Sequence, residues 1–181
     1  MGTRNLIAVF MDGEYKVAQY CQWDGYPSGQ GKDILEFLKT QNLEEFKEKL
    51  RLCKFLSDKD VVDFNEKFEN KSYKLSDFPE FSRDTGSDIL KLILDSQGLK
   101  LQNSISFSGD SLFCEYGYVV DFDKETFEFY KGYNKKEETG RFKEYLDEKS
   151  SYTPITLVGS WNLKELPEVK DLEDLLESQD D

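Results

Sequence analysis

The chain of 181 residues contains no histidine. Ser-His-Asp triads, Cys-His nucleophile pairs and histidine-ligated metals all depend on imidazole, the side chain whose ordinary pKa lies nearest neutrality. The sequence therefore excludes these systems. Any catalysis would have to use carboxylates, thiols, lysine, tyrosine or a carboxylate-bound metal. We favour a non-enzymatic protein and assign no catalytic residue, no metal ligand and no cofactor.

Cysteine is also scarce. Cys21, Cys53 and Cys114 are an odd number, and none of them forms a CxxC pair. This argues against a disulfide framework and against a structural zinc site. No apolar run approaches the ~18 residues of a membrane-spanning helix, and the first residues lack the layout of a signal peptide. We expect a cytoplasmic protein, since a reducing compartment suits free thiols.

The chain also has fewer positively charged residues than negatively charged ones. The formal net charge is −13, and residues 162–181 hold eight acidic residues against two lysines. An acidic surface repels phosphate backbones, so direct nucleic-acid binding is disfavoured. The same surface attracts a basic protein surface, such as the nucleic-acid groove of a host nuclease. The alternative is that the charge only keeps the protein in solution.

Hydrophobic periodicity predicts an α+β fold: a single layered domain in which antiparallel β-hairpins form a sheet that packs against several helices. Asp12-Gly13 is a hairpin signal between strands at 5–10 and 14–20. Asn42 and Ser57, each with an acidic residue three positions later, predict helix caps. We expect helices at 32–39, 43–56, 59–69, 87–96 and 140–149, and further strands at 112–122, 127–131 and 155–161.

We divide the chain into a domain at 1–161 and an acidic C-terminal segment at 162–181. Leu163, Leu166, Val169, Leu172 and Leu175 follow a three-residue spacing that predicts an amphipathic helix. This helix either docks on the domain or binds a partner. A homodimer through it, or through the hairpin edge, is a further alternative.

The segment 22–31 is the most unusual stretch of the sequence, with three glycines, one proline and two large aromatics in ten residues. Glycines before a helix can offer N–H groups to an anion. Trp23 and Tyr26 could instead stack on a ligand or partner. A rigid connection with Trp23 in the core is the remaining alternative. A P-loop is excluded, because position 26 is tyrosine and position 33 is aspartate.

Three other groups of residues have a functional and a structural interpretation. Arg83-Asp84-Thr85-Gly86 either places a guanidinium beside a carboxylate in a cleft or supplies a helix cap. Asp121 and Asp123 share a strand face, as a magnesium pair would, although Asp123 also suits a turn. Cys114 and Glu115 are strand neighbours that face opposite ways, so we expect a buried thiol.

Taken together, these motifs resemble one family. The resemblance rests on the start Met1–Asn5, the loop Gln22–Gly29, Arg83–Gly86, and the stretch 110–123 with its return strand. The family consists of mostly uncharacterised proteins of about this length from bacteria, their phages and some fungi. Its spread among phages implies a gene that helps mobile elements against host defence. It provides no catalytic residues to carry over.

Our leading hypothesis is a non-enzymatic inhibitor of the anti-CRISPR type, which covers a basic groove of a nuclease such as Cas9 with Trp23, Tyr26 and Tyr133 as anchors. The second is a protein that sequesters a small nucleotide-like ligand in a pocket of Arg4, Trp23, Tyr26 and Arg83. The third is a hydrolase with a layered fold of the N-terminal-nucleophile kind. The predicted binding residues are Arg4, Gln22, Trp23, Asp24, Tyr26, Gln30, Arg83 and Asp84.

Overall fold

A five-stranded sheet forms the centre of the protein. In the computed structural model, which describes residues 2–137 and 140–179, the strand order is β2-β1-β5-β6-β7. Neighbouring strands are antiparallel except for β1 and β5, which pair in parallel with Asn5 opposite Tyr116. The α+β prediction is confirmed, and the parallel pair makes the sheet mixed. The strands are β1 (Asn5–Met11), β2 (Glu14–Cys21), β5 (Tyr116–Asp121), β6 (Thr126–Lys131) and β7 (Thr156–Asn162).

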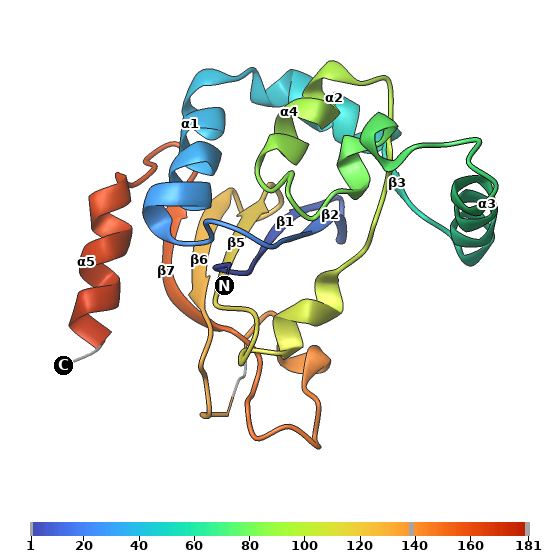
Figure 1. The fold of residues 1–181 in the computed structure, drawn as a ribbon. Helices are drawn as coiled ribbons and strands as arrows, with labels where there is room; N and C mark the ends of the chain where they lie inside the picture. Colours follow the sequence, from blue (N-terminus) through green and yellow to red (C-terminus); the bar gives the residue numbers. More distant parts are fainter. Residues whose placement is uncertain (1, 138–139, 180–181) are drawn as a thin grey trace.

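Four helices cover one face of this sheet (Figure 1). Alternate strand residues such as Ile7, Tyr118 and Phe127 point into that core, where they meet Ile34 and Leu172. The other face carries Leu6, Ala8 and Val119 and is covered by irregular segments with short 3₁₀ turns. The covering helices are α1 (Lys32–Thr40), α2 (Leu43–Leu52), α4 (Asp88–Asp95) and α5 (Val169–Gln179).

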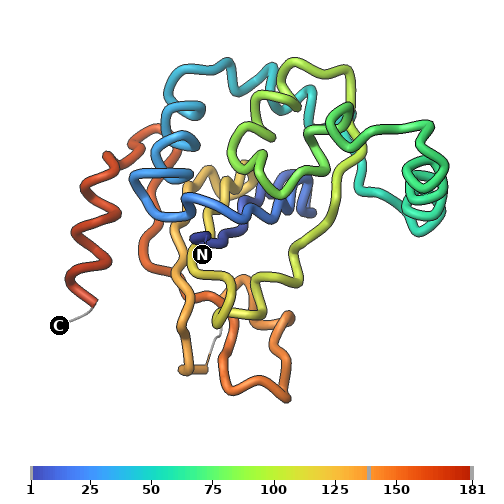
Figure 2. Tube along the Cα trace, viewed as in Figure 1, coloured from blue at the N-terminus to red at the C-terminus, as the bar shows by residue number. Residues whose placement is uncertain are grey.

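The helix α3 (Asp58–Glu69) stands apart from this body, as Figure 2 shows. The chain leaves the body through β3 (Lys54–Phe55), passes through α3 and two 3₁₀ turns, and re-enters the body at α4. After α4, β4 (Lys100–Leu101) pairs in parallel with β3. None of the residues of α3 is fully buried. Its stability comes instead from a local aromatic cluster, in which Phe64, Phe68, Tyr73, Phe78 and Phe81 contact one another.

Three predicted elements differ from the structure. The strand expected at 112–122 is shorter, because β5 covers only Tyr116–Asp121 and residues 111–113 form a turn. The helix expected at 43–56 ends at Leu52, because the chain turns at Cys53 into β3. The helix expected at 140–149 is a single 3₁₀ turn, Lys143–Tyr145, that covers the second face of the sheet. In both of these expected helices a tertiary contact overrides the local helical pattern.

The caps predicted at Asn42 and Ser57 are confirmed. Ser57 and Asp60 form a complete capping box at α3, and Asn42 Oδ1 accepts the N–H of Glu45 at 3.1 Å. The C-terminal helix starts at Val169 and buries Leu172 completely, so it docks on the domain. Residues 180–181 of the acidic segment lie outside the described residues. Across the described chain, each helix is too short or too polar to cross a membrane.

Candidate functional site

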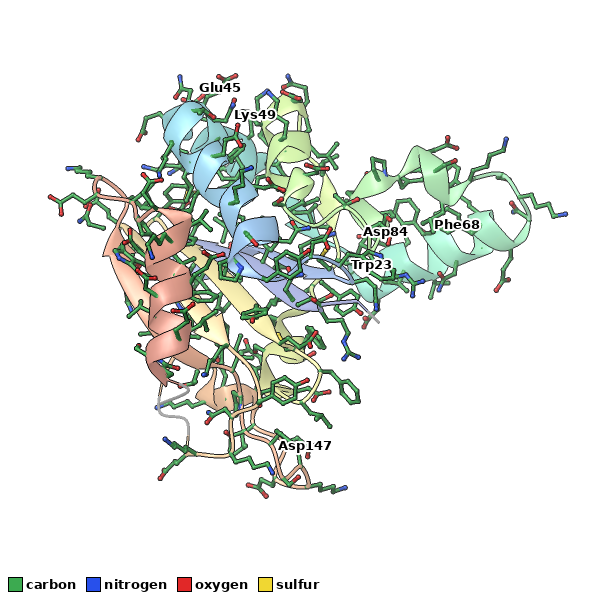
Figure 3. All side chains as sticks on the ribbon, turned by 60° about the vertical axis from the view of Figure 1, so that its left-hand side comes forward. Trp23, Glu45, Lys49, Phe68, Asp84 and Asp147 are labelled. Carbon is green, nitrogen blue, oxygen red and sulfur yellow. The ribbon has the colours of Figure 1, made fainter. Side chains whose placement is uncertain are left out.

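The glycine-rich loop at 22–31 is joined to residues 83–87, which are distant in sequence. The N–H of Gln22 donates to the carbonyl of Arg83 at 2.9 Å. The indole N–H of Trp23 donates to Asp84 Oδ1 at 2.7 Å. The two segments therefore form one surface, and Figure 3 shows Trp23 beside Asp84.

The loop is also anchored from beneath. The buried hydroxyl of Tyr118 donates to the carbonyl of Gly25 at 2.7 Å, and the N–H of Gly25 donates to the carbonyl of Thr3 at 2.9 Å. A Cβ on Gly31 would lie 3.0 Å from the Tyr118 hydroxyl. Glycine allows this close approach, which explains part of the unusual composition. The loop backbone is consequently rigid.

Two aromatic side chains project from this rigid backbone. Trp23 is 43% exposed and Tyr26 is 41% exposed, so the interpretation that places Trp23 in the core is wrong. Trp23 lies over Gly2, where an added Cβ would come within 2.7 Å of the indole ring. The hydroxyl of Tyr26 donates to Asp24 Oδ1 at 3.0 Å. Both aromatics thus carry a hydrogen bond to a carboxylate and stay accessible.

Two carboxylates, those of Asp84 and Asp24, contact the two aromatics, and Asp24 in turn lies within electrostatic range of Asp33. The pKa of Asp33 is raised, first by partial desolvation and then by the charges of Asp88, Glu36 and Asp24, although Lys32 acts in the opposite direction. The hydrogen bond to Asp24 raises the pKa of Tyr26. We call the surface of Trp23, Asp24, Tyr26 and Asp84 the aromatic-acidic surface. Its charge favours a cationic group.

Three N–H groups of the loop are not available to an anion. The N–H groups of Gly25, Gly29 and Gln30 donate to the carbonyls of Thr3, Tyr26 and Asp24, at 2.9, 2.9 and 2.8 Å. These groups are taken within the fold, contrary to the interpretation of the loop as an anion cradle.

The predicted cap of α4 is also wrong. Asp84 bonds to Trp23, and the hydroxyl of Thr85 donates to the carbonyl of Pro79. The N–H of Ser87 at the helix start donates instead to Gln30 Oε1 at 2.8 Å. Gln30 therefore links the loop to α4, a role that sequence spacing does not reveal.

The two predicted arginines have different surroundings. Arg83 contributes its carbonyl to the loop, and its side chain is exposed. The guanidinium of Arg4 lies 4.8 Å from the centre of the Phe113 ring, and its backbone N–H donates to Glu115. The structure thus joins Arg83 to the loop and gives Arg4 other partners. Gln22 also accepts a hydrogen bond from the hydroxyl of Tyr20 at 2.5 Å.

The three thiols are buried. Burial raises the pKa of Cys21 and Cys53, and of Cys114 most strongly, where the charges of Asp110 and Glu115 add to the effect. The thiols are therefore poor nucleophiles near neutral pH, as expected for Cys114.

The paired aspartates Asp121 and Asp123 have protein partners. Asp123 accepts the N–H groups of Asp12 and Gly13 at 2.9 and 2.8 Å. It therefore connects the turn between β5 and β6 to the turn of the first hairpin. Asp121 forms an ion pair with Arg141. Within residues 2–137 and 140–179, no group of three or more Cys, Asp or Glu side chains is placed to hold a metal ion.

Arg141 forms a buried ionic cluster that the sequence did not reveal. Its Nη2 lies 2.5 Å from Asp121 and 2.9 Å from Glu128, and its guanidinium also lies over the ring of Phe10. The only signal was a pair of acidic residues on one face of neighbouring strands. That face becomes buried only after the segment containing Arg141 folds over it.

Comparison of the chain with protein-family models, with curated proteins and with solved structures found no significant match. The rigid loop, the two exposed aromatics and the surrounding carboxylates are therefore the observations on which a function rests.

Proposed function

We propose that the protein is a non-enzymatic binding protein whose aromatic-acidic surface holds a basic protein surface. One observation carries this proposal: Trp23 and Tyr26 are exposed, yet each is fixed by a hydrogen bond to a carboxylate. Exposed aromatics are common binding anchors. Because these two are already ordered, little conformational entropy is lost when a partner binds.

The chemistry of the surface favours lysine or arginine on the partner. A guanidinium or ammonium group can lie over an aromatic ring and pair with an adjacent carboxylate. Asp24 and Asp84 supply those carboxylates beside the rings. The net charge of −13 would accelerate the approach of a basic partner and make it sensitive to salt.

The concrete form of the proposal is an anti-CRISPR-type inhibitor that covers the nucleic-acid groove of a nuclease. The acidity of the chain supports this form. Such a groove combines a strongly basic surface with a function that its occupation would block.

The test is the affinity of the purified protein for a Cas9–guide RNA complex, measured by biolayer interferometry at 50 and 300 mM salt. We expect Trp23→Ala to weaken binding about tenfold or more, and the higher salt to slow association. Val62→Ala is the control, because it truncates an exposed apolar side chain on α3, outside the aromatic-acidic surface. Equal affinities of Trp23→Ala and the wild type would exclude the aromatic-acidic surface as the binding site.

A further inference from the structure

A groove of about 570 Å³ lies where β6 ends and β7 begins. Its volume falls within the range of small-molecule sites. Three lysines and one glutamate line it, which makes it a basic region on a chain whose net charge is −13. The lining residues used below are Lys131, Tyr133, Lys135, Lys136, Glu137 and Leu157.

The backbone presents Tyr133 to this groove in a specific conformation. Tyr133 has a φ of 53° and is 61% exposed, whereas Gly132 and Asn134 on either side are buried. A positive φ is unfavourable for a residue with a side chain, and such conformations cluster at functional sites. The surrounding fold imposes it here and turns the phenol ring outward.

Hydrogen bonds fix the backbone on both sides of the ring. The N–H of Tyr133 donates to the carbonyl of Ser111 at 2.7 Å, and that of Gly132 donates to the carbonyl of Glu115 at 2.8 Å. The side-chain amide of Asn134 donates to the carbonyl of Pro154 at 3.0 Å. The ring is thus an exposed aromatic on a fixed base, as the two aromatics of the loop are.

We propose that this groove binds a nucleotide, with its base stacked on Tyr133 and its phosphates beside Lys131, Lys135 and Lys136. The aromatic ring and the lysines each match one part of such a ligand. Leu157, which is 46% exposed, adds an apolar wall from β7. Among the described lining residues, the three lysines outnumber the one acidic residue, Glu137.

The rest of the chain argues for a free nucleotide over a nucleic-acid strand. The net charge of −13 repels a long polyanion, whereas a mononucleotide meets only the groove. Lys135, which lines the groove, has its Nζ 4.9 Å from the ring centre of Tyr152.

Isothermal titration calorimetry with ATP tests the proposal, with adenosine, pyrophosphate and a ten-nucleotide oligoadenylate as further probes. We expect saturable ATP binding and weaker binding of adenosine and of pyrophosphate. The oligonucleotide should bind no more tightly than ATP. Tyr133→Gly should weaken ATP binding about fivefold to a hundredfold, the loss typical of one stacked base. The double change Lys135→Gln and Lys136→Gln should also weaken it and reduce its salt dependence.

Tyr133→Gly is a fold-safe variant, because glycine adopts a positive φ without strain, and its thermal unfolding should match or exceed that of the wild type. Leu75→Ala is the control for the loss of an exposed apolar side chain, and Lys59→Gln with Lys74→Gln is the control for charge. Both should leave ATP binding unchanged. The proposal is overturned if ATP gives no saturable heat at millimolar concentration, or if Tyr133→Gly binds it as tightly as the wild type. If pyrophosphate binds as tightly as ATP, the base makes no contribution, and the groove is a phosphate site and not a nucleotide site.

Discussion

On each face of the sheet, a buried polar side chain attaches a segment that is remote in sequence. On one face, the Tyr118 hydroxyl fixes the glycine-rich loop. On the other, Arg141 neutralises Asp121 and Glu128, which are both buried. Each group acts on a segment that is remote in sequence. Replacing one side chain therefore tests a whole contact between segments.

Tyr118→Phe removes the hydroxyl while it keeps the ring in the core. We expect the free energy of unfolding to fall by about 1 kcal/mol, since the carbonyl of Gly25 loses its buried donor. Urea denaturation monitored by tryptophan fluorescence measures this change. An unchanged midpoint would show that the loop does not depend on this hydrogen bond.

Arg141→Met removes the cation and leaves two buried carboxylates. We expect a loss of about 3–5 kcal/mol at pH 7, the usual consequence of breaking a buried pair on one side. Urea denaturation at pH 7 tests this expectation. A loss below 1 kcal/mol at pH 7 would mean that water replaces the guanidinium.

At the scale of elements, the body and the protruding α3 differ in how they are stabilised. The body is stabilised by burial in a common core, to which α5 contributes Leu172. The helix α3 depends on its cap, on its aromatic cluster and on an ion pair to β4 through Asp60 and Lys100. We therefore expect different responses to mutation and to pH.

Leu172→Ala tests whether α5 is part of the fold. Leu172 is fully buried, so its truncation should cost about 2–4 kcal/mol of unfolding free energy. Leu157→Ala is the control, because Leu157 is 46% exposed and its truncation should change stability by less than about 0.5 kcal/mol. Chemical denaturation compares them. Equal effects would mean that α5 is not docked in solution.

Asp60→Asn tests α3. The hydrogen bond from Lys100, followed by the backbone N–H of Ser57, lowers the pKa of Asp60 to about 2. Because this pKa lies below the ordinary value of ~3.9, the contribution of the carboxylate is present above about pH 4 and is lost as the pH falls toward 2.

We expect amide hydrogens of α3 to exchange several-fold faster in Asp60→Asn than in the wild type at pH 6, and the difference to disappear near pH 2. Hydrogen exchange measured by mass spectrometry and corrected for intrinsic rates tests the expected difference at pH 6 and its disappearance near pH 2. Identical protection of α3 in the two proteins at pH 6 would show that the cap and the ion pair do not hold it.

The sequence predicted the elements that depend on local chemistry, including the Asp12-Gly13 hairpin and the caps at Asn42 and Ser57. It did not predict the parallel pairing of Asn5 with Tyr116, because more than a hundred residues separate the partners. It placed the loop and Arg83-Asp84 among the candidate residues. It did not reveal the groove at Tyr133, because that groove depends on a positive φ and on a later strand.

At the scale of the whole molecule, two exposed aromatic surfaces stand in environments of opposite charge. The aromatic-acidic surface carries Asp24 and Asp84 beside its rings, whereas the groove at Tyr133 is lined by three lysines. A basic protein and a nucleotide would thus select different surfaces. The proposed function and the proposed nucleotide site can therefore fail independently.

The central claim is tested most directly by native mass spectrometry of the tagged wild type and of Trp23→Ala. Each protein is recovered from a lysate of bacteria that carry several defence systems. We expect the wild type to retain a stoichiometric protein with a basic surface and Trp23→Ala to lose it. If Trp23→Ala retains the same partner, or if the wild type retains no protein, the claim that the aromatic-acidic surface binds a basic protein is contradicted.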